Sequence, residues 1–111
     1  MIALKFREAN RDIFEAIKSG IKKVETRAAT EKYRGLKGGE KVKLICGTDT
    51  FQKEIVKVTI FASIEGLLKK YRPEEINPKV NSREELAQMF YSFPGYKEKI
   101  KQFGFVAIEL E

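Results

Sequence analysis

A glycine at position 20 separates two different hydrophobic patterns near the start of the chain. Before it, apolar residues recur at the spacing of one helix face, which predicts a helix over about residues 11–19 with Asn10 as its N-cap. Gly20 has no Cβ and can adopt the left-handed conformation that ends a helix. After it, the residues from Val24 to Thr30 alternate as in a strand. A corner between a helix and a strand is therefore expected here.

Alternating apolar and polar residues predict four more strands. These strands cover residues 2–6, 41–46, 51–61 and 105–110. The alternation is broken at Ile55-Val56, which indicates a bulge within the third of them. The turn Gly47-Thr48-Asp49 joins residues 41–46 to that long strand. Five strands are enough for a sheet that curls toward a small barrel.

Helical spacing predicts three more helices. One begins at Ser63 and ends at Pro73, one begins at the capping box of Ser82, and one runs from Tyr96 to Gly104. Residues 31–40 carry no such pattern and are expected to form a basic loop. The whole pattern indicates one α+β domain over residues 1–111, a small β-barrel of five or six strands flanked by helices.

The charge of the chain favours an anionic partner. The formal net charge is +6, and residues 18–41 hold eight basic and three acidic residues, so this stretch carries most of the excess. A local surplus of this kind is typical of a binding face. The expected partner is nucleic acid, and anionic lipid is the second choice. The alternative is that the basic residues serve solubility alone.

Several kinds of site are excluded by residues that the chain lacks. It has no histidine and a single cysteine, so it cannot form a histidine triad, an intrachain disulfide or a cysteine zinc cluster. We expect neither a metal nor a cofactor. Cys46 lies in an apolar run and is interpreted as a buried small side chain. No signal peptide or membrane-spanning run is found, so we expect a cytoplasmic protein without a membrane partner.

Three charged side chains follow the helix-to-strand corner. Arg27 offers a planar set of donors for a phosphate, and Glu25 offers acceptors for an amino group or for the arginine itself. Lys22 lies beside Lys23, which would lower its pKa, and near Glu25, which would raise it. Lys22 could then be a general base or nucleophile in a closed site, or a phosphate-binding charge in a solvated one.

Aromatic residues near basic ones suggest stacking on a base. Tyr33 lies between Lys32 and Arg34, and Tyr91, Phe93 and Tyr96 also lie in predicted loops or helix ends, so any of the four could stack on a base. Core packing is the alternative for each tyrosine. The full set of predicted ligand-binding residues is Lys22, Lys23, Glu25, Arg27, Tyr33, Arg34 and Tyr91.

The pattern Gly20-x-Lys22-x-x-Glu25-x-Arg27 resembles the signature of ASCH domains, a family of PUA-like folds. A glycine turn follows, Gly39-Glu40, where the family more often has Gly-Asp. Phe90-Tyr91 and the closing run 104–110 resemble small archaeal stand-alone members. The resemblance covers nearly the whole chain. It implies a small β-barrel flanked by helices, a cleft where the motif side chains gather, and a role related to RNA or nucleotides.

Three functions are compatible with these observations. We favour a non-catalytic module, expected to be a monomer, that binds RNA or a modified nucleotide in a basic cleft around the motif. The alternative is a small hydrolase for N4-acetylcytidine or RNA, with Lys22 as base or nucleophile and Glu25 as acid or orienting group. One bacterial branch of the family hydrolyses N4-acetylcytidine, but it has a threonine where this chain has Glu25. The third possibility is a protein-interaction domain whose charges form a solvated face.

Overall fold

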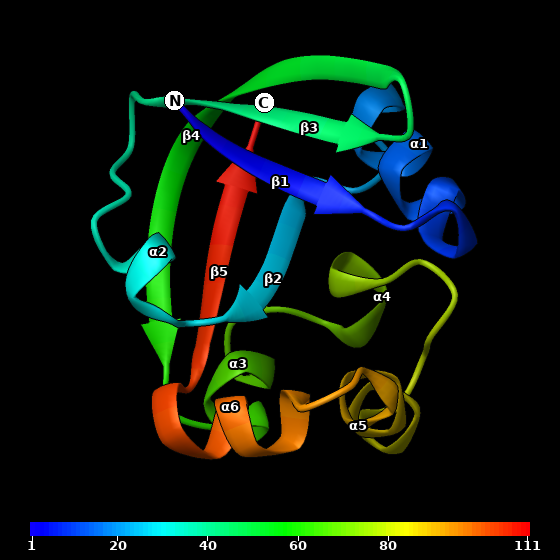
Figure 1. Cartoon of the computed structure of the whole chain (residues 1–111). Coiled ribbons are helices and arrows are strands. Elements are labelled where there is room, and N and C mark those ends of the chain that lie inside the picture. The colour runs from blue at the N-terminus through cyan, green and yellow to red at the C-terminus, as the bar shows by residue number, and fades with distance from the viewer.

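The strands form one curled sheet in the spatial order β1-β3-β4-β5-β2 (Figure 1). β1 and β3 are parallel, and the other neighbours are antiparallel. The computed structural model describes all residues from 1 to 111. The strands are β1 (Ile2–Phe6), β2 (Val24–Ala28), β3 (Lys41–Cys46), β4 (Asp49–Phe61) and β5 (Phe105–Leu110). The curled sheet makes a half-barrel, and its two edge strands are β1 and β2.

Short helices pack against both faces of this half-barrel. They are η1 (Glu8–Asn10), α1 (Arg11–Ser19), α2 (Glu31–Arg34), α3 (Ile64–Leu68), α4 (Pro73–Ile76), α5 (Arg83–Ser92) and α6 (Tyr96–Phe103). In Figure 1, α3, α5 and α6 lie together at one end of the long strands, and α1 lies near the other. None of the helices has the length and hydropathy that a membrane-crossing helix needs.

The sheet separates two hydrophobic cores. The inner core fills the concave side and includes Leu4, Phe14, Ile17, Val42, Leu44, Ile55, Val106 and Ile108. The helix-side core lies between the other face and α3–α6, and includes Val24, Ala28, Ile64, Leu67, Leu86, Phe90, Phe105 and Ala107. Each strand alternates its side chains between the two faces, so β5 supplies residues to both cores. Burial on both sides explains why β5 reads as an almost continuous apolar run.

Most predicted elements are confirmed, including the α+β class and the bulge. The register between β4 and β5 shifts between Ile55 and Lys57. Ser63 accepts a hydrogen bond from the amide of Gly66, and Ser82 accepts one from the amide of Glu85, as expected of N-caps.

Several predicted boundaries or caps were wrong. β4 begins at Asp49 rather than at residue 51, and α3 ends at Leu68 rather than at Pro73. The strand after the corner ends at Ala28 rather than Thr30, because the Thr30 amide turns back to the carbonyl of Ala28. The expected loop at 31–40 begins instead with α2, whose Tyr33 is buried in the inner core. Pro73 begins α4, the position where its missing N–H costs nothing. Asn10 precedes α1, but its side chain makes no capping hydrogen bond.

Gly104, between α6 and β5, allows a stability prediction. Its φ is +77°, and a Cβ added there would lie 2.3 Å from the carbonyl oxygen of Phe61. We expect Gly104→Ala to lower the free energy of unfolding by about 2 kcal/mol or more, because backbone strain and a main-chain clash add together. Urea denaturation would measure the loss.

Gly35 provides the matched control. Its φ is −91°, and an added Cβ would meet no atom within 4 Å. We expect Gly35→Ala to leave the stability unchanged or to raise it by about 0.5 kcal/mol. Equal effects of the two substitutions would show that Gly104 is not under the constraint described.

Candidate functional site

The register of β2 points two charged side chains into the half-barrel. Glu25 lies opposite Ile108 and Arg27 lies opposite Val106, and both partners on β5 belong to the inner core. Directly opposite residues of an antiparallel pair share a face. Glu25 and Arg27 therefore point toward the concave side, at the edge of the sheet, and not toward open solvent.

Lys22 contacts Glu25 from the protein interior. Gly20 ends α1 with a φ of +85°, and the chain then carries Lys22 into the protein, where it is only 2% exposed. Its Nζ donates to the carbonyls of Val24 and Ile76 and lies 3.4 Å from Oε1 of Glu25. An ammonium has three donors, so all three have a partner. Lys22 thereby joins the end of α4 to the start of β2.

Glu25 and Arg27 continue the chain of charges toward the other edge strand. Oε2 of Glu25 accepts a hydrogen bond of 2.9 Å from Nε of Arg27. Nη2 of Arg27 donates to the carbonyl of Lys5 on β1, at 3.1 Å. The Arg27 guanidinium also lies 4.8 Å from the centre of the Phe6 ring, close enough for a cation–π contact. One side chain thus spans the gap between β1 and β2.

The surroundings shift the pKa values of three groups in opposite directions. Burial lowers the pKa of Lys22, and the nearby Glu25 carboxylate offsets only part of this effect. Burial is the largest influence on Arg27 and would lower its pKa, but the charge and hydrogen bond of Glu25, together with Tyr33 and Tyr96, outweigh it, so the pKa of Arg27 is raised. Burial raises the pKa of Tyr96, whose hydroxyl therefore stays neutral.

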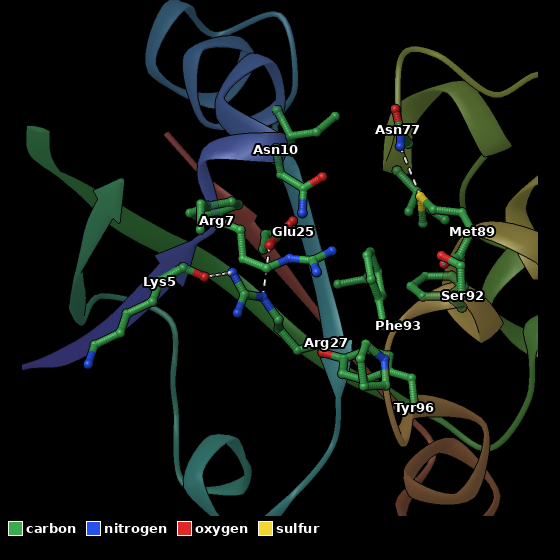
Figure 2. Close-up of a pocket in the computed structure, with 16 residues that line it drawn as sticks. Lys5, Arg7, Asn10, Glu25, Arg27, Asn77, Met89, Ser92, Phe93 and Tyr96 are labelled. Carbon is green, nitrogen blue, oxygen red and sulfur yellow. Dashed lines mark hydrogen bonds and ion pairs between the residues drawn. The ribbon is translucent and has the colours of Figure 1, made fainter. Parts of the chain in front are cut away.

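A cavity of about 510 Å³ opens beside Glu25 and Arg27 (Figure 2). β1 and β2 form one wall, and the turn between α5 and α6 forms the other, with Phe93 and Tyr96. Lys22 does not line this space. The cavity therefore offers polar groups on the strand side and aromatic rings on the helix side.

Two guanidinium groups at the cavity have donors without a partner. Arg7 makes no hydrogen bond or ion pair with its side chain, and its guanidinium lies 5.6 Å from the Phe93 ring. Nη1 of Arg27 is also unpaired, since Nε and Nη2 make the bonds described above. Figure 2 shows Arg7 and the amide of Asn10 directed toward the cavity, while the ammonium of Lys5 points away. The only carboxylate, Glu25, is already neutralised by Lys22. The cavity thus favours an anion.

The other predicted site residues lie elsewhere. The side chain of Lys23 is exposed, and Tyr33 is buried in the inner core. Arg34 donates to the carbonyls of Ala29 and Phe103. Tyr91 lies in a second depression, with Lys97 6.0 Å from its ring. The structure therefore brings Lys22, Glu25 and Arg27 together, and separates these four from them.

The sequence named Phe93 and Tyr96 as candidates for stacking on a base, but it did not identify Arg7 and Asn10 as site residues or place the four together. Arg7 and Asn10 follow β1, and the two aromatic residues flank the α5–α6 turn, so they are far apart in the chain. Of the basic residues at 18–41, only Arg27 lines the cavity. The one available signal was position, since both pairs lie where one predicted element ends and the next begins.

Replacing Lys22 tests its structural role. We expect Lys22→Met to lower the free energy of unfolding by about 3–5 kcal/mol, because it leaves a buried carboxylate and two carbonyls without their partner. Lys23→Met removes the same charge from an exposed neighbour and should change the stability by no more than about 0.5 kcal/mol. Urea denaturation of both variants gives the comparison; equal losses would contradict the role assigned to Lys22.

The pH dependence of stability tests the shifted pKa of Lys22. In the unfolded chain Lys22 keeps its proton up to about its ordinary value of 10.5, but the folded protein releases it at lower pH. Between those two values the unfolded state binds more protons, so stability rises with pH. The difference in unfolding free energy between the native chain and Lys22→Met should therefore grow toward pH 10.5. A difference that is constant from pH 7 to 10.5 would contradict a lowered pKa.

Comparison with known proteins gives the family. Residues 10–111 match the ASCH domain. The crystal structure of the hypothetical protein PH0355, from an archaeon, is similar, with 30% sequence identity, a TM-score of 0.80, and coverage of 98% of this chain and 95% of that one. The solution NMR structure of protein PF0455 from Pyrococcus furiosus is also 30% identical, with a TM-score of 0.74 and coverage of 99% and 94%. A search of curated proteins finds no match. The chain belongs to the ASCH domain family, as the corner motif predicted.

Proposed function

We propose that this protein binds RNA or a nucleotide by taking one nucleotide unit into the cavity between β1, β2 and the α5–α6 turn. A volume of about 510 Å³ lies in the range of small-ligand sites, roughly 300–1,000 Å³. The observation that carries the proposal is the unpaired guanidinium of Arg7, which lies between Arg27 and an aromatic ring.

The two walls suit the two ends of a nucleotide. Arg7 and Nη1 of Arg27 offer planar, charged donors of the kind that bind phosphate. Phe93 and Tyr96 form an edge-to-face pair with ring centres 5.3 Å apart, and they offer apolar surface to a base. The fixed position of Arg27 adds to this fit, because Glu25 and the Lys5 carbonyl already hold its guanidinium. Little side-chain entropy is then lost on binding.

The hydrolase alternative is less well supported. A base or nucleophile must reach the reacting atom, within about 3 Å or through one water. Lys22 does not line the cavity, and its three donors are engaged within the protein. Each oxygen of Glu25 also has a cationic partner. Both groups therefore serve better to position Arg27 than to carry out a reaction.

Removing the unpaired arginine tests the proposal. We expect Arg7→Ala to weaken the binding of a uridine-rich single-stranded RNA and of UMP by about tenfold or more, the usual effect of losing a charge-assisted hydrogen bond. The salt dependence of RNA affinity should also become less steep, by roughly 0.7 in the log–log slope for one phosphate contact. Calorimetry for UMP and fluorescence anisotropy for RNA provide the affinities.

Lys43 provides a control of equal charge. It is exposed on β3, and it does not line the cavity. Lys43→Ala should leave UMP affinity within about twofold, because its side chain is exposed to solvent outside the cavity, where salt screens its charge. Equal weakening by the two variants would mean that net charge, and not the cavity, governs binding. Absence of binding by the native protein would refute the proposal.

A further inference from the structure

The outer edge of β2 faces the cavity and is not paired with another strand. β2 pairs only with β5, so the main-chain groups on its other side have no neighbouring strand. In an antiparallel pair, only alternate residues direct their N–H and C=O toward the partner. The bonds from the Leu110 amide to the Lys23 carbonyl, and from the Ala29 amide to the Gly104 carbonyl, fix which residues these are. Val24, Thr26 and Ala28 accordingly direct their main-chain groups away from β5.

Two of these three residues have their carbonyls occupied. The carbonyl of Val24 accepts from Nζ of Lys22, and that of Ala28 accepts from the Thr30 amide. Thr26 alone keeps a free carbonyl, and its N–H points the same way. Thr26 lines the cavity and is only 7% exposed, so its outward edge faces the cavity and has little contact with bulk water. Unpaired main-chain groups in such a place are costly, and a ligand that pairs them would be favoured.

We propose that the N–H and C=O of Thr26 recognise the edge of the nucleobase in this cavity. They place one donor beside one acceptor, and the complementary ligand is a base edge with an acceptor next to a donor. Uracil offers a carbonyl beside N3–H, and cytosine offers N3 beside its amino group. This inference rests on the proposed function, since it assigns the base-reading element of the same site.

The short length of the open edge favours a base over a peptide. A peptide that adds a strand uses several consecutive main-chain groups of the edge. Here the carbonyls of Val24 and Ala28, the next outward residues on either side, are already bonded, so only Thr26 offers both a free carbonyl and an N–H. A flat, two-point hydrogen-bonding group suits that length. The aromatic rings and guanidinium groups nearby also suit a base attached to a phosphate, as argued above.

The first test changes the ligand and leaves the protein native. UMP and 3-methyl-UMP differ by one methyl group, which removes the N3–H donor and blocks the edge. We expect 3-methyl-UMP to bind about tenfold more weakly or worse, in line with a lost hydrogen bond and a new clash. Addition of UMP, but not of 3-methyl-UMP, should also shift the amide resonance of Thr26 downfield and slow its hydrogen exchange.

The second test changes the protein. Thr26→Pro removes the outward N–H, and proline is tolerated at an edge strand because that N–H is not part of the ladder. We expect it to reduce UMP affinity about tenfold, whereas Lys43→Ala, an exposed change outside the cavity, should bind UMP within about twofold of the native chain. Circular dichroism shows whether each variant folds. If the proline variant does not fold, the ligand pair and the Thr26 amide signal decide.

The outcomes separate this inference from the proposed function. Equal binding of UMP and 3-methyl-UMP by the native chain would overturn the role of Thr26 and leave nucleotide binding intact. Absence of binding to UMP, cytidine monophosphate and RNA would overturn both. A Thr26 amide that responds to an extended peptide, but to no nucleotide, would show that the edge recognises a strand instead. Discrimination by the methyl group together with the Thr26 amide shift supports the inference.

Discussion

The buried ammonium of Lys22 is the contact on which the site depends. It connects the carbonyl of Val24 on β2, the carbonyl of Ile76 at the end of α4, and the carboxylate of Glu25. A charge that is 2% exposed is unfavourable without such partners. The partners lie on two segments, β2 and α4, so the ammonium is satisfied only when the corner, the sheet edge and α4 are all in place. Satisfying this charge therefore fixes the wall of the cavity.

Arg27 joins the two edge strands, β1 and β2, at the open seam of the half-barrel. A closed barrel would pair β1 with β2 through main-chain hydrogen bonds, but here a guanidinium reaches from β2 to the Lys5 carbonyl. A side chain is longer than a ladder hydrogen bond, so it holds the two edges apart while still joining them. The cavity lies beside this seam, with the α5–α6 turn as its other wall. The same feature leaves the outer main-chain groups of Thr26 without a strand partner.

Much of the fold was predictable from local pattern, and the site was predictable only in part. Alternation and cap residues such as Ser63 and Ser82 identified the strands and helices, because local sequence determines those features. The motif predicted the meeting of Lys22, Glu25 and Arg27, which lie within a few residues of one another. Nothing local indicated that Arg7 would meet Phe93, since only the curl of the sheet brings them together. The sequence also did not show that Lys22 lies in the protein interior and not in the cavity wall. Its burial depends on contact with α4, which is more than fifty positions away in the chain.

The cost of these buried charges is evidence about their purpose. Apolar residues of similar volume often stabilise a protein as well as a buried ion pair does, or better. Retaining Lys22, Glu25 and Arg27 therefore makes sense where geometry matters more than stability. Glu25, held by Lys22, fixes Nε of Arg27, and the Lys5 carbonyl fixes Nη2, so the remaining Nη1 has a defined direction at the cavity. A guanidinium held in this way can bind an anion without first being ordered, which is the advantage that the buried charges provide.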